Sequence, residues 1–185
     1  MAASAATLTW CLGEWVTRRH ASFLGAASGM VAGLVAITPA CGWVGPMSAI
    51  VIGALAGIIC LTAVVWLKAK LGYDDALDVF GVHGIGGIAG ALLTGIFVNP
   101  NWSGGWQGMG VTDYLATDTS TKLAEYSLSA QMTAQIYGVV VAVVLSAVVS
   151  FVACLICKFT VGLRVDEQDE RQGLDITSHN ERAYN

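Results

Sequence analysis

The sequence predicts an all-α membrane protein, a polytopic helical bundle of about five transmembrane helices. The chain has 185 residues, of which 55% are hydrophobic and only 12% are charged, whereas about a quarter of the residues in soluble domains are charged. Three long runs contain no Asp, Glu, Lys or Arg: residues 21–67, 79–112 and 126–157. Glycines recur at four-residue spacing inside these runs, as small residues do where membrane helices pack closely.

The composition excludes several other classes of protein. The chain is too rich in Val, Ile, Leu and Ala, and its net charge of −4 is too small, for an intrinsically disordered protein. Its 9 Lys and Arg residues are scattered, so we expect no nucleic-acid partner. Cys154 and Cys157 form a C-x-x-C pair inside an apolar run, without a second ligand pair. We therefore predict no metal site and no other cofactor.

Turn signals divide the uncharged runs into membrane spans. A transmembrane helix needs about 20 apolar residues, so the run at 21–67 is too long for one span and suits two. Pro39, Gly42 and Pro46 mark the turn between them. The first apolar stretch of the chain is short, and the last is long enough to tilt. The predicted spans are residues 1–16, 21–41, 47–67, 79–98 and 130–160.

The basic residues orient these spans. Cytoplasmic loops of membrane proteins carry an excess of Lys and Arg. The chain follows this rule if the ends of its predicted spans near residues 18, 70 and 164 are cytoplasmic. Only Lys122 then lies outside. We predict a multi-pass protein of the cell (plasma or inner) membrane with its N-terminus outside, a transmembrane domain at 1–163 and a cytoplasmic tail at 164–185. The basic residues on the cytoplasmic side are Arg18, Arg19, Lys68, Lys70, Lys158, Arg164, Arg171 and Arg182.

The uncharged run at 79–112 contains a histidine, His83, among several glycines. An ionisable side chain inside a membrane span is costly and indicates a functional site by default. A neutral imidazole has one donor and one acceptor, so it suits proton transfer or the binding of a polar substrate. The alternative is a histidine that bonds to a carbonyl of a neighbouring helix; we favour the functional interpretation.

Other polar residues near the spans have structural interpretations. Asp78 begins the span of His83, where its carboxylate is expected to cap the helix N-terminus. Asp74 and Asp75 are expected to be solvated. Ser28 and Thr38 lie in the span at 21–41, where each hydroxyl is expected to bond back to a carbonyl of its own helix.

These residues fall in stretches that resemble the ammonium transporter family (the Amt, Mep and Rh proteins), most closely the bacterial Amt type. The most specific stretch is Asp74-Asp75 followed by Asp78-Val-Phe-Gly-Val-His83-Gly. The resemblance runs along essentially the whole chain and corresponds to the C-terminal half of the family's proteins only. Further matching stretches are Gly25-Ala-Ala-Ser28-Gly, Gly33-Leu-Val-Ala-Ile-Thr38-Pro-Ala-Cys-Gly42, Gly162-Leu-Arg-Val165, and Gly173-Leu-Asp175 followed by His179 and Ala183-Tyr184.

The resemblance implies a fold and a function. The five predicted spans resemble the last five helices of the eleven-helix ammonium transporter fold. The resemblance implies transport of ammonium or ammonia through an apolar pore in a homotrimer embedded in lipid, with a possible PII-type signalling protein at the cytoplasmic face, and no enzymatic activity. The family's first-half pore histidine has no counterpart in this sequence. We therefore expect a C-terminal portion of a transporter that does not function alone.

The resemblance also assigns roles to individual residues. His83 resembles the second-half pore histidine, Ser28 a serine near the cytoplasmic side of the pore, and Val79 and Val31 apolar wall positions. Thr38 matches a family threonine on the substrate pathway. Structural support of the pore is expected from Asp78, Gly84 and Gly87. The residues of the expected regulatory tail are Gly162, Arg164, Gly173, Asp175, His179 and Tyr184.

Two other functions compete with transport. Ser28-Gly29 in one span and His83 in another are typical of an intramembrane serine protease of the rhomboid type, in which a serine and a histidine form a nucleophile–base pair. The glycine that leads the protease motif is replaced by Ala26, which disfavours this interpretation. The third possibility is a noncatalytic membrane subunit that only packs against or regulates a partner.

Overall fold

The described part of the chain, residues 1–99 and 126–182, is helical and contains no strand in the computed structural model. The prediction of an all-α fold is therefore confirmed. The chain divides into two compact units, Met1–Val139 and Val140–Asn185. Its helices and π-helical segments (η) are α1 (Ala2–Arg18), α2 (Phe23–Ile37), α3 (Pro46–Thr62), η1 (Ala63–Leu67), α4 (Lys68–Leu71), η2 (Phe80–Gly84), α5 (Ile85–Phe97), α6 (Leu128–Thr160), α7 (Glu167–Gln172) and α8 (Leu174–Thr177).

Three of the described helices are long and apolar enough to cross a membrane. They are Pro46–Leu71, in which η1 and α4 continue α3, Phe80–Phe97, which joins η2 to α5, and α6. The apolar helix α2 has 15 residues and α1 has 17. α2 is shorter than the span predicted at 21–41 because its start is capped and Pro39, which lacks an N–H group, follows its end.

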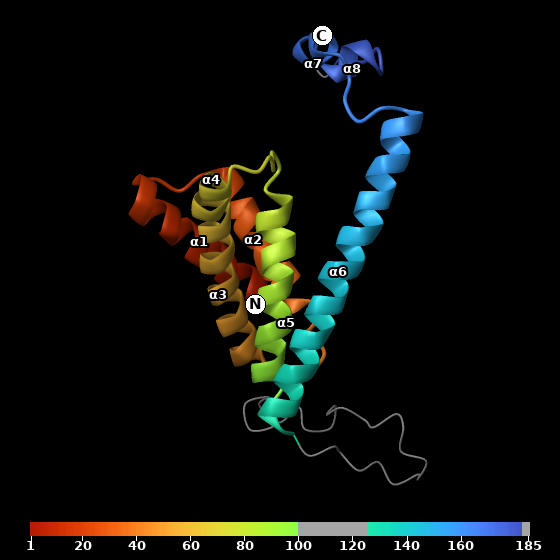
Figure 1. Cartoon of the computed structure of the whole chain (residues 1–185). Helices are drawn as coiled ribbons and strands as arrows, with labels where there is room; N and C mark the ends of the chain where they lie inside the picture. The colour runs from red at the N-terminus through yellow and green to blue at the C-terminus, as the bar shows by residue number, and fades with distance from the viewer. Residues whose placement is uncertain (100–125, 183–185) are drawn as a thin grey trace. The chain divides into compact units, whose positions relative to one another are not determined.

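Helices α1, α2, α3 and α5 pack side by side in the first unit (Figure 1). The close approach of α1 to α2 and α3 depends on glycines that have no room for a side chain. A Cβ atom at Gly33 would lie 2.6 Å from the carbonyl oxygen of Ala2, and one at Gly53 would lie 2.6 Å from the Cα atom of Ala2. The four-residue glycine spacing therefore marks real helix–helix contacts, as predicted.

Two clusters of buried apolar residues hold these helices together. One cluster contains Trp10, Ala32, Cys60, Leu61 and Val82, which come from α1, α2, α3 and η2. Trp10 is only 2% exposed. The second cluster contains Ala36, Ala40, Val44, Ile52 and Ala56, so small side chains dominate the interior and the helix backbones lie close together.

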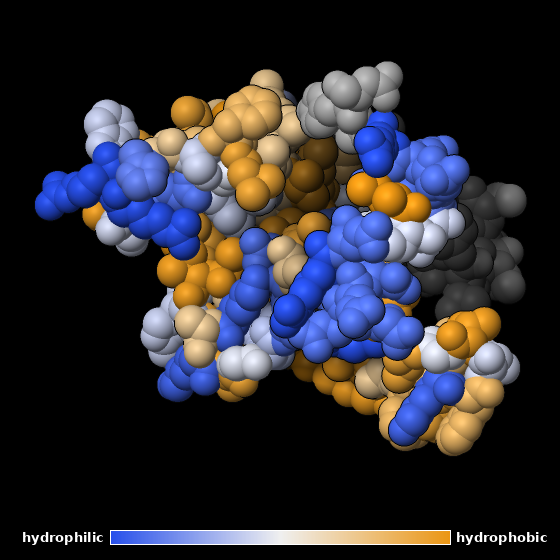
Figure 2. Space-filling model, turned by 90° about the horizontal axis from the view of Figure 1, so that it is seen from above, coloured by the Kyte–Doolittle hydropathy of each residue, from blue (hydrophilic) through white to orange (hydrophobic). Residues whose placement is uncertain are grey.

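Polar residues gather at the ends of the helices. Figure 2, a view from above, shows hydrophilic residues in blue beside hydrophobic residues in orange. At the other end of α5, the Tyr126 hydroxyl donates to the carbonyl of Gly95 at 2.8 Å. Burial raises the pKa of the Tyr126 phenol. The hydrogen bond holds the start of α6 against α5.

In the second unit, α6 ends in a glycine cap before the short helices of the tail. Gly162 has φ 83°, and the N–H groups of Val161 and Gly162 both donate to the carbonyl of Cys157, at 3.0 and 2.8 Å. Glycine adopts this left-handed backbone without strain, which explains its place at the helix end. The functional division at 163/164 remains a prediction.

The contact between Gly53 and α1 leads to a prediction about stability. In the natural protein that contains this sequence, we expect Gly53→Ala to lower the free energy of unfolding by about 1–3 kcal/mol, because its methyl group would overlap the backbone of Ala2. Gly42→Ala is the matched control, since a Cβ atom there meets nothing within 4 Å. Unfolding in detergent micelles measures both; equal effects of the two substitutions would contradict the contact.

Candidate functional site

The helix that carries His83 begins at η2, and Asp75 caps it. Asp75 Oδ1 accepts the N–H of Val79 at 2.8 Å, and Oδ2 accepts the N–H groups of Phe80 and Gly81 at 2.9 and 3.3 Å. The first N–H groups of a helix have no carbonyl partner within it, and a carboxylate there also interacts favourably with the helix dipole. The expectation that Asp75 is merely solvated is therefore wrong.

Asp78 does not have the capping role predicted for it. Its backbone lies in the left-handed region, with φ 56°, and its carboxylate Oδ1 lies 2.8 Å from the ammonium nitrogen of Lys68. The same ammonium group donates to the backbone carbonyl of Asp75. Asp78 thus fastens the loop before η2 to the first residue of α4, because its backbone turn directs the carboxylate there while Asp75 reaches the helix N-terminus. Any support that Asp78 gives the helix of His83 is indirect.

His83 lies in the π-helical turn η2, where the backbone bonds run from i to i+5. Its side chain is exposed, and within residues 1–99 and 126–182 its imidazole has no hydrogen-bond partner. The alternative of a bond to a neighbouring helix carbonyl is not realised in this part of the chain. The two preceding residues, Gly81 and Val82, are buried, so His83 faces different surroundings from theirs. Gly84 lies against the ring of Phe80, and Gly87 has open space where a side chain would be.

The other predicted pathway residues occupy different places. Val79 begins the same helix and is 50% exposed, and Val31 packs against the buried cluster that contains Val82. The Thr38 hydroxyl donates to the carbonyl of Leu34 at 2.7 Å, which confirms the bond to its own helix. Ser28 instead lines a pocket that Asp78 also lines.

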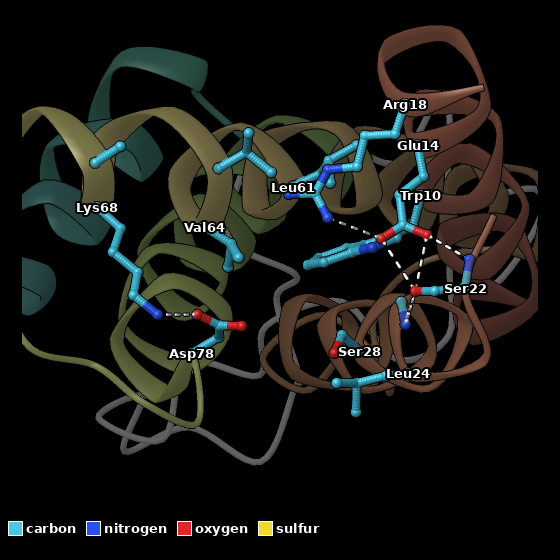
Figure 3. A pocket seen from close by; sticks show the side chains of 13 residues that line it. Trp10, Glu14, Arg18, Ser22, Leu24, Ser28, Leu61, Val64, Lys68 and Asp78 are labelled. Carbon is cyan, nitrogen blue, oxygen red and sulfur yellow. Dashed lines mark hydrogen bonds and ion pairs between the residues drawn. The ribbon is translucent and has the colours of Figure 1, made fainter. Parts of the chain in front are cut away.

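This pocket has a volume of about 400 Å³ and opens among α1, the start of α2 and α4 (Figure 3). Two carboxylates, Glu14 and Asp78, and two cations, Arg18 and Lys68, line it together with Ser28. His83 is not among its lining residues. The arrangement provides a polar cavity with balanced charge beside the apolar helices, which suits water and small polar solutes.

Glu14 is the most buried carboxylate of the described residues, at 5% exposure. Its Oε2 accepts the backbone N–H of Ser22 at 2.8 Å and the Ser22 hydroxyl at 3.1 Å, while the Ser22 oxygen accepts the N–H of Gly25 at 2.9 Å. Arg18 lies 4.0 Å away and balances the charge. These bonds join the end of α1 to the capped start of α2, which positions Ser28 at the pocket.

The tail residues have local structural roles where they are described. Gly162 ends α6, and Gly173, with φ 99°, separates α7 from α8. The backbone carbonyl of Asp175 accepts the N–H of Glu181 at 2.8 Å, and the N–H of His179 donates to Leu174. Arg164 lies exposed between α6 and α7. Tyr184, like Lys122, lies outside the described residues.

Comparison with known proteins now identifies the family. The model of the Ammonium Transporter Family matches residues 1–184. The chain belongs to this family. It is 43% identical over 185 residues to an ammonium transporter of Aquifex aeolicus, covering 100% of this chain and 40% of that protein. It is 40% identical over 184 residues to an ammonium transporter of Bacillus subtilis, covering 99% of this chain and 42% of that protein.

Solved structures of family members share the fold. A structure described as a sensor Amt protein superposes with a TM-score of 0.78 at 28% identity, covering 96% of this chain and 39% of that one. Mep2 of Saccharomyces cerevisiae superposes with a TM-score of 0.70 at 31% identity, covering 90% of this chain and 36% of that one. The chain thus spans about two fifths of the length of the curated relatives that it matches.

The family membership bears on the competing functions. The prediction of a membrane protein that is not an enzyme is confirmed, because the curated relatives are ammonium transporters. The protease interpretation has no support: Ser28 lines the polar pocket, His83 does not, and no hydrogen bond joins the two side chains. No finding supports a noncatalytic packing subunit.

Several residues of this region were not predicted from the sequence. Lys68 was expected only as a positive charge on the cytoplasmic side, and Trp10 and Cys60, which are buried next to η2, were not expected at the site. Glu14 offered a signal, because it is the one carboxylate in the first apolar stretch of the sequence. For Asp75 the sequence offered no comparable signal, because Asp78 occupies the position directly before the helix that a capping residue normally takes.

The different roles of the two aspartates lead to a prediction. Asp75→Asn removes the charge and one acceptor oxygen from the cap, so we expect a loss of about 1 kcal/mol of stability. Asp78→Asn leaves a residue that tolerates the left-handed backbone and removes a partly exposed ion pair, worth at most about 1 kcal/mol. Hydrogen exchange at the amides of residues 79–81 separates them: only Asp75→Asn is expected to accelerate it. Equal acceleration by Asp78→Asn would contradict the assignment of the cap.

Proposed function

We propose that the natural protein containing this sequence carries ammonium or ammonia across a membrane, and that His83 lies on the pathway. The observation that supports this best is an imidazole on a helix long and apolar enough to cross a membrane, in a chain of the ammonium transporter family. An ionisable side chain inside a membrane span is costly and indicates a functional site by default.

The surroundings of His83 suit a small, weakly hydrated substrate. Val79 and Val31 supply apolar wall, where Na⁺ and K⁺ cannot replace their hydration shells, whereas ammonia can cross with a single polar partner. A neutral imidazole donates one hydrogen bond and accepts another, so it can accompany a substrate that changes between ammonium and ammonia. Asp75 fixes the start of the helix and therefore the depth of the imidazole.

The polar pocket is a suitable inner end for this pathway. With the proposed orientation, in which the N-terminus of this chain is outside and the tail is cytoplasmic, the pocket faces the cytoplasm because it lies beside Arg18, Lys68 and the start of α2. Ser28 lines it and follows Ser22, the capping residue of α2, by about 1.7 helical turns. A departing substrate would thus pass from apolar walls to a hydrated cavity with balanced charge.

The assembly and regulation belong to the same proposal. We place the protein in the cell membrane as a homotrimer, with transmembrane residues 1–163 and a regulatory tail at 164–185. The short helices α7 and α8, the turns at Gly162 and Gly173, and Arg164, Asp175, His179 and Tyr184 form that tail. A PII-type signalling protein is the proposed partner at the cytoplasmic face.

The role of His83 predicts a selective transport defect. We expect His83→Ala to lower methylammonium uptake by roughly tenfold or more, the effect of losing one hydrogen bond to a charged or strongly polar substrate. His20→Ala is the matched control, because His20 lies exposed in the loop between α1 and α2. Uptake by cells that express the natural protein measures both variants at equal membrane abundance. Undiminished uptake in His83→Ala would exclude His83 from the pathway.

A further inference from the structure

The two π-helical segments of the first unit lie against each other. η1 continues α3, and η2 opens the helix of His83; the two segments are in contact. π-helical turns are rare, occur as single turns inside α-helices, and are common at functional sites. Because two such rare turns lie in contact beside His83, we expect contacts between them to stabilise the π-helical backbone.

A close contact joins the two turns. Gly81 of η2 is buried against Val64 of η1, and a Cβ atom at Gly81 would lie 2.7 Å from Val64 Cγ2. The branched side chain of Val64 therefore fills the space that a side chain at Gly81 would occupy. This complementary pair fixes how far the two helices can approach and how η2 can rotate.

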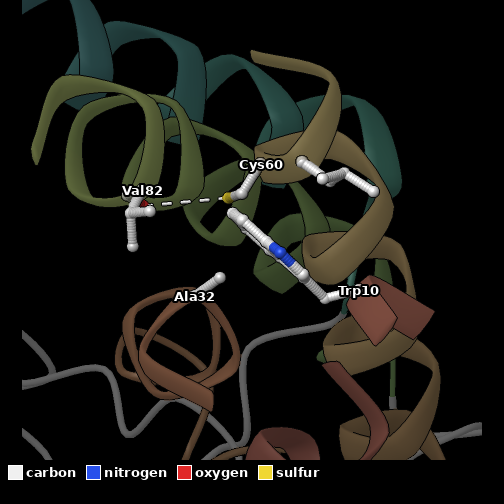
Figure 4. Packing of buried hydrophobic residues seen from close by; sticks show 5 residues of the cluster. Trp10, Ala32, Cys60 and Val82 are labelled. Carbon is white, nitrogen blue, oxygen red and sulfur yellow. Dashed lines mark hydrogen bonds between the residues drawn. The ribbon is translucent and has the colours of Figure 1, made fainter. Parts of the chain in front are cut away.

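A polar contact reinforces the same register. The Cys60 thiol, which is fully buried, lies 3.8 Å from the backbone carbonyl of Val82 and donates to it (Figure 4). A side chain that bonds to a helix carbonyl is a recognised cause of local departure from the α-helical ladder. Val82 immediately precedes His83, so this contact acts on the peptide next to the histidine.

The consequence for His83 follows from helix geometry. One residue of an α-helix corresponds to roughly 100° of rotation, so the extra residue of a π turn changes the direction of the side chains before it relative to those after it. Conversion of η2 to a regular α-helical turn would therefore turn the imidazole of His83 away from its present direction relative to α5.

We propose that Val64, Gly81 and Cys60 are positioning residues that hold the π turn of η2 and thereby direct the imidazole of His83 into the transport pathway. The consequence for transport rests on the proposed function, whereas the effect on the imidazole does not. None of the three residues contacts the substrate. They act through the backbone of η2, from the buried side opposite His83.

The test enlarges one side chain in η2 and shortens the side chain that it meets in η1. Gly81→Ala overlaps Val64, and Val64→Ala removes the overlapping methyl groups, so the double variant should restore the fit. We expect Gly81→Ala to shift the ¹⁵N resonances of the His83 ring and to lower methylammonium uptake toward that of His83→Ala. The double variant should return both quantities toward wild type. His83→Ala assigns the resonances, and Gly138→Ala is the control, because its Cβ atom meets nothing within 4 Å.

A second pair of variants keeps the proposal testable if Gly81→Ala does not fold. Cys60→Ser keeps a donor for the Val82 carbonyl and should leave the His83 resonances near their wild-type positions, whereas Cys60→Ala should shift them. Unchanged His83 resonances in both Gly81→Ala and Cys60→Ala, or a double variant no closer to wild type than Gly81→Ala, would overturn the proposal. If the variants do not shift the His83 resonances, the positioning role is refuted. If the variants shift these resonances but the wild-type protein takes up no methylammonium, only the transport function is refuted.

Discussion

The structure depends on the satisfaction of backbone N–H groups where a helix starts at the edge of an apolar region. In such surroundings an unpaired amide is costly, and water is not freely present to pair with it. Asp75 resolves this for the helix of His83 by accepting three amides, and Lys68 holds the loop in place through Asp78 and the carbonyl of Asp75. The start of the helix that carries His83 is thus set by this cap.

Close backbone packing carries that constraint to the rest of the first unit. Gly33 and Gly53 bring α1 against α2 and α3, and Glu14 joins the end of α1 to the start of α2. Together these contacts bury Trp10 beside Cys60 and Val82. The same small-residue packing that gives the bundle its stability thus presents η1 to η2. The orientation of η2, which carries His83, therefore depends on the apolar helices packed around it.

Much of the fold was predictable from the sequence, because uncharged runs, prolines and glycine spacing report directly on span length and helix contact. His83 also stood out, since an ionisable residue inside such a run is costly and is seldom found there without a function. The cap was not predictable: Asp75 and Asp78 lie in one short loop, and the left-handed backbone of Asp78 decides which carboxylate meets the amides. The π turns have no signature in side-chain periodicity, and the network of Glu14 forms only when two helix ends meet. The span predicted at 21–41 was too long at both ends, because Ser22 caps the start of α2 and Pro39 follows its end.

The central claim is that the imidazole of His83 faces a pathway through the membrane. A structure of the natural protein in a lipid bilayer, determined with methylammonium present and with side chains resolved, tests it most directly. We predict that the π turn at η2 is retained and that the imidazole faces a continuous pathway lined by Val31 and Val79. An imidazole that faces lipid, or that lies in a dry helix contact away from any pathway, would contradict it.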